Sequence, residues 1–246
     1  MISGIDSQPA HSDSDLVGQV EQIFGPGGIL SEAKNFEYRL QQQAMAADVM
    51  HALEANQNFV VEAGTGVGKS LGYLVPAILH GQAHVKKAII STHTINLQEQ
   101  LIEKDLPMLQ RILPVDFTYT MLKGRANYLC TRRLARAMHR ADSLFTSPEI
   151  AELKRVQEWA KDTADGSLSD FEVEPDLKVW DEICSERGLC SPKLCGRGSD
   201  SASLHGECFF QKARRRFLSA DVLVVNHSLF FATLGTLSES DADEES

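Results

Sequence analysis

Short apolar runs alternate with stretches of helical periodicity along much of the chain. The apolar runs are rich in β-branched and aromatic residues, which favours buried strands, whereas the longer stretches between them favour helices. The expected strands cover Phe59–Val61, Lys87–Thr92, Phe117–Leu122 and Asp221–Asn226, and the expected helices cover Leu71–His80 and Asn96–Lys104. Strands that alternate with helices predict an α/β fold with a parallel sheet.

The segment between Lys123 and Arg216 breaks this alternation and contains all five cysteines. We therefore expect a mainly helical insertion within the α/β core. We expect five segments along the chain. They are an acidic, mostly disordered tail (1–34), the first part of the core (35–122), the insertion (123–210), a return strand and helix of the core (211–237) and a second acidic, disordered tail (238–246). Leu16–Leu30 has some apolar spacing and is a candidate short helix within the first tail.

Charge is distributed unevenly over the 246 residues. The formal net charge is −10, but residues 1–33 and 238–246 each hold five acidic residues and no Lys or Arg. The remaining residues hold equal numbers of acidic and basic side chains, so the net charge does not argue against a nucleic-acid partner. Without an apolar run long enough for a membrane span or a secretory signal, we expect a cytoplasmic protein with no membrane partner.

A glycine-rich sequence follows the first expected strand and precedes a helix. It runs Glu62-Ala-Gly-Thr-Gly-Val-Gly-Lys-Ser70, a phosphate-binding loop with Ala in its first position. Backbone N–H groups of such a loop converge on phosphate oxygens, and the helix N-terminus adds partial positive charge. Lys69 is expected to contact the β- and γ-phosphates of ATP, and the Ser70 hydroxyl to bind Mg²⁺. The loop residues expected to bind nucleotide are Ala63, Gly64, Thr65, Gly66, Val67, Gly68, Lys69 and Ser70.

The five cysteines lie at Cys130, Cys184, Cys190, Cys195 and Cys208. Because no export signal is present, disulfides are not expected. Structural zinc is disfavoured because no C-x-x-C pair occurs. The spacing suits a four-thiolate iron–sulfur cluster, although unrelated buried or free thiols remain the alternative.

Five sequence elements together resemble DinG-type DNA helicases, superfamily-2 enzymes related to XPD. They are Arg39-Leu-Gln-Gln42, Glu62–Ser70, Ser91-Thr92 with the Leu97–Leu101 segment, Lys123-Gly-Arg125 through Cys130, and Cys208-Phe-Phe with Val224-Val-Asn-His227. The resemblance implies a RecA-like P-loop NTPase core, ATP hydrolysis coupled to 5′→3′ unwinding, and a role in DNA repair. It assigns Arg39 and Gln42 to adenine recognition. It assigns a [4Fe–4S] cluster to Cys130, Cys190, Cys195 and Cys208, with the choice between Cys184 and Cys195 open.

Basic residues gather around the expected cluster ligands. Residues 121–140 contain six bases and no acid, and Arg132, Arg136 and Arg140 share one helix face. We expect these bases to contact the backbone of single-stranded or forked DNA, and motif Ia at Thr92 to do so by resemblance. A solvated basic face balanced by nearby acids is the alternative. The candidate DNA contacts are Thr92, Lys123, Arg125, Arg132, Arg136 and Arg214.

The acidic D-E-A-H sequence that the helicase family places after the Val-Val-Asn-His strand does not occur before Ser246. Asp181-Glu182 imitates it, but Lys178 interrupts the preceding apolar run. We therefore interpret the chain as the amino-terminal ATP-binding and iron–sulfur portion of a monomeric helicase. Two alternatives are a non-enzymatic iron–sulfur DNA-binding module with a residual nucleotide site, and a P-loop kinase-like enzyme that uses Asp181 and Glu182.

Overall fold

The structure, a computed structural model, describes residues 15–33, 36–64 and 66–232. Its contacts divide the chain into two compact units. The first unit comprises Met1–Ala88 and Glu103–Thr118, and the second comprises Ile89–Ile102 and Tyr119–Ser246. The two units are therefore described separately.

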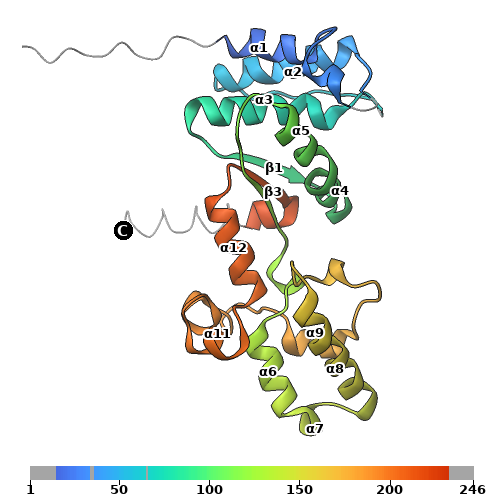
Figure 1. Cartoon of the computed structure of the whole chain (residues 1–246), viewed down its shortest axis with the longest axis vertical. Coiled ribbons are helices and arrows are strands. Elements are labelled where there is room, and N and C mark those ends of the chain that lie inside the picture. The colour runs from blue at the N-terminus through green and yellow to red at the C-terminus, as the bar shows by residue number, and fades with distance from the viewer. Residues whose placement is uncertain (1–14, 34–35, 65, 233–246) are drawn as a thin grey trace, which may run out of the picture. The chain divides into compact units, whose positions relative to one another are not determined.

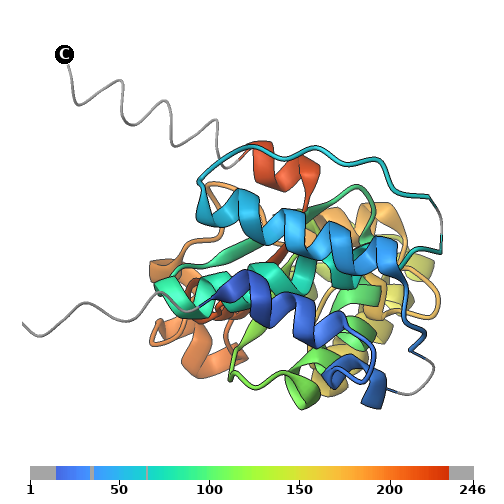
Figure 2. The same cartoon turned by 90° about the horizontal axis from the view of Figure 1, so that it is seen from above.

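The first unit consists of helices. α1, α2 and α3 lie side by side in both views of the chain (Figures 1 and 2), and their apolar faces form a shared core that includes Val20, Met50 and Leu74. α2 and α3 are long enough to run together over several turns. The elements are α1 (Leu16–Phe24), η1 (Ile29–Glu32), α2 (Leu40–Glu54), α3 (Lys69–His84) and α5 (Leu106–Ile112).

The start of this unit differs from the tail expected over residues 1–34. Asp15 accepts a hydrogen bond from the Gly18 amide and so caps α1, which confirms the candidate helix within Leu16–Leu30. Leu16, Val20, Ile23 and Phe24 are buried against the neighbouring helices. Burial of this apolar face explains why residues 15–33 are folded despite their acidic composition. Residues 1–14 lie outside the described part of the chain.

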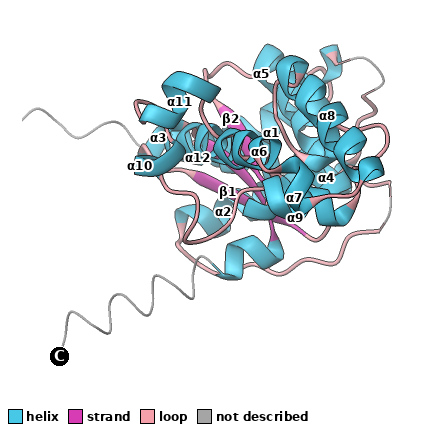
Figure 3. Cartoon of the chain, turned by 90° about the horizontal axis from the view of Figure 1, so that it is seen from below, coloured by secondary structure: helices cyan, strands magenta, loops and turns pink. Residues whose placement is uncertain are grey.

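The second unit combines a small sheet with many helices. Its strands are β1 (Ala88–Thr92), β2 (Tyr119–Leu122) and β3 (Val222–Asn226), in the order β1-β3-β2. β2 and β3 are parallel, with Tyr119 opposite Val222 and Leu122 opposite Val225. Figure 3 shows how little of the chain is strand. The expected strands at Lys87–Thr92, Phe117–Leu122 and Asp221–Asn226 are thus confirmed, as is a parallel α/β arrangement.

The strand expected at Phe59–Val61 is not formed. Residues 57–64 are irregular, and the Val60 side chain is 95% exposed. A strand requires a ladder of hydrogen bonds with a neighbour, and the three described strands pair only with one another. Apolar composition alone therefore predicted the wrong local structure at this position.

Most of residues 123–210 is helical, as the sequence predicted for this segment. Outside this segment, α4 and η2 together span the helix expected at Asn96–Lys104, and α12 is followed by β3. The helical elements are α4 (Ile95–Gln100), η2 (Leu101–Asp105), η3 (Arg125–Asn127), α6 (Thr131–His139), α7 (Ala141–Leu144), α8 (Ser147–Asp162), η4 (Leu168–Asp170), α9 (Leu177–Ile183), α10 (Pro192–Cys195), α11 (Asp200–His205) and α12 (Phe209–Ser219).

A single core holds most of the helices between residues 123 and 219 together. Leu153 of α8, Trp180 of α9 and Ala213 of α12 belong to one buried cluster. Trp159 stacks on Phe171 with ring centroids 3.8 Å apart, and Trp180 lies edge-on to both rings. The cysteines belong to the same cluster, so this core fixes the backbone that carries them. No helix among the described residues is both long and apolar enough to cross a bilayer.

Candidate functional site

The phosphate-binding loop leads directly into α3. Gly66 and Gly68 both have φ of 82°, a left-handed conformation that glycine adopts without steric cost, and Gly68 is the residue before the first turn of α3. Thr65 lies outside the described residues, so its expected contact with nucleotide cannot be placed. Ala63, Gly64 and Val67 lie in the irregular segment that precedes the helix. The N–H groups of the first turn of α3 have no acceptor within the helix, and such groups bind anions at helix N-termini.

Lys69 and Ser70 occupy the first two positions of α3. The Lys69 Nζ donates hydrogen bonds to the carbonyl oxygens of Ala63 at 3.0 Å and Gly64 at 2.9 Å. The exposed ammonium group thus folds back over the loop, where a phosphate could replace the carbonyls as its acceptor. Burial raises the pKa of the neighbouring Tyr73, whose side chain hydrogen-bonds with Ser70.

The two residues assigned to adenine recognition differ in their surroundings. Gln42 of α2 is buried, and its Nε2 donates a 2.8 Å hydrogen bond to the Gly68 carbonyl. Arg39 immediately precedes α2 and forms a 2.8 Å ion pair with Glu37. Gln42 is therefore bound to the loop itself, whereas Arg39 is paired locally.

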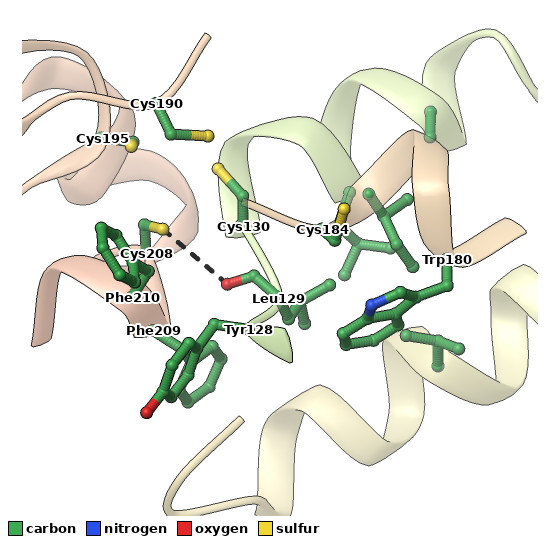
Figure 4. Packing of buried hydrophobic residues seen from close by; sticks show 14 of the residues in the cluster. Tyr128, Leu129, Cys130, Trp180, Cys184, Cys190, Cys195, Cys208, Phe209 and Phe210 are labelled. Carbon is green, nitrogen blue, oxygen red and sulfur yellow. Dashed lines mark hydrogen bonds between the residues drawn. The ribbon is translucent and has the colours of Figure 1, made fainter. Parts of the chain in front are cut away.

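Four of the five cysteine side chains converge in the second unit (Figure 4). The sulfur atoms of Cys130, Cys190 and Cys195 all lie within 4.8 Å of one another. Cys208 interacts with Cys130 and Cys190, and its Sγ lies 3.8 Å from the Leu129 carbonyl oxygen. All of these thiols are buried.

Different elements supply these sulfurs. Cys130 precedes α6, Cys195 ends α10, and Cys208 precedes α12. Backbone hydrogen bonds join the segments, because the Cys208 amide donates to Cys195 and the Phe209 amide donates to Leu129. The arrangement thus joins sequence positions that are far apart without requiring a C-x-x-C pair.

Hydrogen bonds among the thiols shift the pKa values of the individual cysteines. Hydrogen bonds from Cys130 and Cys208 hold the pKa of Cys190 far below its ordinary value. The hydrogen bond to Cys190 raises the pKa of Cys130. The hydrogen bond with Cys130 lowers the pKa of Cys208, but the hydrogen bond with Cys190 and burial outweigh it and raise that pKa to about 12. Buried thiols packed this closely suit a soft metal centre, which binds them as thiolates and releases their protons.

Cys184 lies apart from this group. It follows α9, and Figure 4 shows its sulfur beside Trp180 and away from the sulfurs of Cys190, Cys195 and Cys208. Its Sγ lies 3.7 Å from the Asp181 carbonyl oxygen, and burial raises its pKa. Cys195 therefore lies with the thiol group and Cys184 does not.

Lys123, one of the expected DNA contacts, is enclosed by the protein. Its side chain is 3% exposed, and its Nζ lies 3.4 Å from carboxylate oxygens of both Glu99 and Asp165. It also donates to Ser167 at 2.9 Å and to Ser169. No local sequence pattern indicates this network, because Glu99 and Asp165 are distant from Lys123 along the chain. A phosphate could reach this ammonium group only by disrupting these contacts.

Several predicted basic contacts bind backbone carbonyls. Arg125 donates to the carbonyls of Glu186 and Cys190, at 3.2 and 2.8 Å, and Arg132 donates to Leu189 at 2.5 Å. Arg133, which was not among the predicted contacts, donates to Cys184 and Asp181. These arginines fasten the segment that carries Cys184 and Cys190 to the start of the helical region.

The remaining predicted contacts are distributed over other elements. Arg136 on α6 and Arg214 on α12 are exposed, whereas Thr92 is buried and its hydroxyl donates to the Thr94 carbonyl at 3.1 Å. Arg136 lines a groove of about 470 Å³ whose wall carries both arginines and glutamates. The charged lining comprises Arg132, Arg133, Arg136, Arg140, Glu182 and Glu186.

Two further arrangements bear on the sequence interpretation. Asp181 and Glu182 lie within helix α9, so this acidic pair is not at a strand end as a hydrolytic acid pair would be. The Ser91 hydroxyl hydrogen-bonds with His227 Nδ1 at 2.7 Å, where β1 and β3 end. The sequence had assigned no role to His227.

A glycine loop at the start of a helix, together with an α/β sheet, defines a nucleotide-binding protein of the P-loop class. The profile of the DEAD/DEAH box helicase family matches residues 39–178. The chain belongs to the DEAD/DEAH box helicase family. Membership implies a RecA-like α/β fold, in agreement with the parallel strands.

Named relatives support the resemblance to DinG-type helicases. The chain is 37% identical over 222 residues to the ATP-dependent DNA helicase YoaA of Haemophilus influenzae. The aligned region covers 89% of this chain and 33% of that protein. It is 38% identical to YoaA of Escherichia coli, over 86% of this chain and 32% of that protein. It is 36% identical to the ATP-dependent helicase DinG of Mycobacterium tuberculosis, over 78% of this chain and 30% of that protein. The chain thus spans about a third of the length of these relatives.

Proposed function

We propose that this chain is the ATP-binding and iron–sulfur portion of an ATP-dependent DNA helicase. In this proposal the loop at residues 63–70 binds ATP, Lys69 contacts its terminal phosphates, and Ser70 binds Mg²⁺. The geometry of the loop at the start of α3 supports these roles, as does the hydrogen bond from Gln42 to Gly68. ATP hydrolysis would be coupled to 5′→3′ unwinding of single-stranded or forked DNA by the longer enzyme, which we propose acts as a cytoplasmic monomer.

The cysteine group carries the iron–sulfur part of the proposal. Three sulfurs lie within 4.8 Å of one another, and Cys208 interacts with all three of these cysteines. A [4Fe–4S] cluster needs four thiolates from a buried, preformed pocket, and these residues provide that donor set. We assign Cys130, Cys190, Cys195 and Cys208 as ligands, and Cys184 as a buried thiol outside the site. The bound cluster would link segments that are distant in the sequence and so stabilise the helical region.

The DNA contact is proposed for the exposed bases. Arg136 and Arg214 have side chains free to approach a phosphate, and Arg132 shares the groove of Arg136. Arg125 and Lys123 fit a supporting role better, because their donors are occupied by carbonyls and carboxylates. In this proposal the exposed arginines contact DNA, whereas Lys123 and Arg125 stabilise the fold that presents them.

Anaerobic purification of the chain, with iron and sulfide analysis, tests the cluster. The wild-type chain is expected to be brown and to hold about four irons. Cys195→Ser is expected to lose most of the iron, whereas Cys184→Ser, the matched control, is expected to retain it. A colourless chain with stoichiometric zinc would refute the cluster assignment. Iron loss in Cys184→Ser with iron retention in Cys195→Ser would show that Cys184, and not Cys195, is the fourth ligand.

A nucleotide titration tests the other half of the proposal. The chain is expected to bind ATP with Mg²⁺, and Lys69→Ala to bind it much more weakly with an unchanged iron content. DNA binding is measured separately, by the change in fluorescence anisotropy of a labelled single strand. Arg136→Ala and Arg214→Ala are expected to weaken that binding, and an unchanged affinity in both would contradict the proposed DNA surface.

A further inference from the structure

A second group of metal-binding side chains lies in the first unit, at the ends of α2 and α3. His80 and His84 are four residues apart on α3 and so project from the same face of the helix. Glu54 is the last residue of α2. The parallel packing of the two helices brings this carboxylate against both imidazoles.

The three side chains converge on a small volume. The Glu54 Oε1 lies 2.9 Å from His84 Nε2 and 3.5 Å from His80 Nε2. One donor atom from each residue lies within 4.8 Å of the other two, and the imidazole centroids are 4.4 Å apart. In a tetrahedral zinc site, bond lengths of about 2.0–2.2 Å place neighbouring ligand atoms roughly 3.3–3.6 Å apart. The group therefore needs only small side-chain adjustments to enclose an ion.

The surroundings favour a cation at this position. α2 and α3 both end here, so the negative ends of two helix dipoles contribute partial negative charge. The end of α3 is fixed because Val85 adopts a left-handed φ of 53° and the Lys86 amide donates to the Gly81 carbonyl at 2.8 Å. The side chain of Lys86 is an opposing charge, but it lies in solvent, which screens it.

Accessibility also suits an ion site. The His80 side chain is 12% exposed and is held by its neighbours, whereas His84 is 43% exposed and opens toward solvent. An ion can thus enter from the His84 side, and a water molecule can complete its coordination. Two imidazoles and one carboxylate form a donor set that Zn²⁺ commonly uses.

We propose that Glu54, His80 and His84 form a binding site for a divalent transition-metal ion, best matched to Zn²⁺. The site is distinct from the phosphate loop, because α3 carries Lys69 at its first residue and His84 at its last, about 22 Å away along the helix axis. It is also distinct from the cysteine group, which belongs to the second unit. The bound ion would join α2 and α3 at one end, while Gln42 and Gly68 join the same helices at the other.

Zinc titration of the complete chain, followed by measurement of bound metal after removal of the excess, tests this site. Because any cysteine thiolates without a cluster also take up added Zn²⁺, the informative quantity is the difference between variants. The wild-type chain is expected to hold one more Zn²⁺ than His84→Ala, with at least a tenfold loss of affinity at this site in the variant. His139→Ala, which removes an exposed histidine of α6, is the matched control and is expected to bind as the wild type does.

Cobalt provides a second measurement that distinguishes the two metal centres. Co²⁺ bound by nitrogen and oxygen gives visible bands without the thiolate charge-transfer absorption of a cysteine site. His84→Ala is expected to lose the first signal and to retain the second, and Glu54→Gln to do the same. Equal zinc stoichiometry and equal cobalt spectra in the wild type and in a folded Glu54→Gln or His84→Ala variant would overturn the proposal. Circular dichroism establishes which variant is folded, and either one suffices.

Discussion

The side-chain amide of Gln42 donates a 2.8 Å hydrogen bond to the carbonyl of Gly68, which lies 26 positions further along the chain. Gly68 precedes the first turn of α3, and Gln42 is buried within α2. The bond therefore connects the phosphate-binding loop with a neighbouring helix. It fixes the backbone at the junction between the loop and α3, immediately before Lys69, the first residue of the helix.

Replacement of Gln42 by Ala is expected to weaken ATP binding about five- to tenfold. The variant leaves the Gly68 carbonyl without its side-chain partner, a loss of roughly 1–1.5 kcal/mol for a hydrogen bond of this kind. Isothermal titration with ATP and Mg²⁺ measures the effect. Gln41→Ala is the control, because Gln41 is exposed on the same helix. Equal affinities in the two variants would show that the bond does not contribute to the site.

Gly66 and Gly68 allow conformational strain to be separated from crowding. Both have φ of 82°, but an added methyl group at Gly66 meets nothing within 4 Å, whereas one at Gly68 would lie 2.1 Å from the Gln42 Nε2. Gly66→Ala is expected to cost about 1–2 kcal/mol of stability from the backbone alone. Gly68→Ala is expected to cost more, because Gln42 must also move.

Chemical denaturation of the chain, monitored by circular dichroism, compares the free energies of unfolding of the two glycine variants. The double variant Gly68→Ala with Gln42→Ala provides the control, since removal of the amide relieves the crowding but not the strain. Its additional cost over Gln42→Ala alone should approach the cost of Gly66→Ala. If Gly66→Ala and Gly68→Ala destabilise the chain equally, steric crowding by Gln42 is unimportant.

The elements with strong local patterns were predictable from the sequence. The strand at Val222–Asn226 is rich in β-branched residues and is buried on both faces, and α3 begins where the glycine loop ends. Phe59–Val61 has the same apolar character but no strand partner among the described residues. Local pattern specifies a preference for a strand, whereas the hydrogen-bonded neighbour is a tertiary property that a single sequence does not reveal.

The same distinction applies to the site residues. The sequence proposed a group of four cysteines but left the choice between Cys184 and Cys195 open, and only the fold separates Cys195 from Cys184. Charge composition suggested that Lys123 and Arg125 were available to DNA. The structure pairs one with carboxylates and the other with carbonyls, through residues more than 20 positions away. The partner of a long basic side chain depends on packing, so composition predicts the presence of charge but not its availability.

Lys123→Ala is expected to destabilise the second unit. The change leaves Glu99 and Asp165 without their shared cation in partly buried positions, with an expected loss of about 2–4 kcal/mol. Lys161→Ala is the matched control because its ion pair with Glu158 is exposed on both sides, and its expected loss is below about 0.5 kcal/mol. Urea unfolding monitored by tryptophan fluorescence measures both. Equal stabilities would identify Lys123 as a surface-like residue whose carboxylate contacts contribute little.

Glu149 is expected to make the stability of α8 dependent on acid pH. Its carboxylate accepts hydrogen bonds from Lys178 and from the Thr146 amide, and these contacts lower its pKa from 4.5 to about 2. A lowered pKa in the folded state means that the ionised form contributes stability above pH 4.5. This contribution diminishes as the pH falls below 4.5 and is lost toward pH 2. Glu149→Gln, which stays neutral, should therefore show a weaker loss of stability over this interval than the wild type.

Urea titrations at a series of pH values between these limits measure this difference. Glu158→Gln is the control, because it replaces a second carboxylate of α8 that pairs with the exposed Lys161 and lies away from the helix N-terminus. The capping arrangement at Thr146 gives a second expectation. Helicity near the start of α8 should decrease in Glu149→Gln even at neutral pH, because glutamine replaces the charged acceptor at the helix N-terminus. Identical pH slopes in the wild type and Glu149→Gln would contradict the proposed linkage.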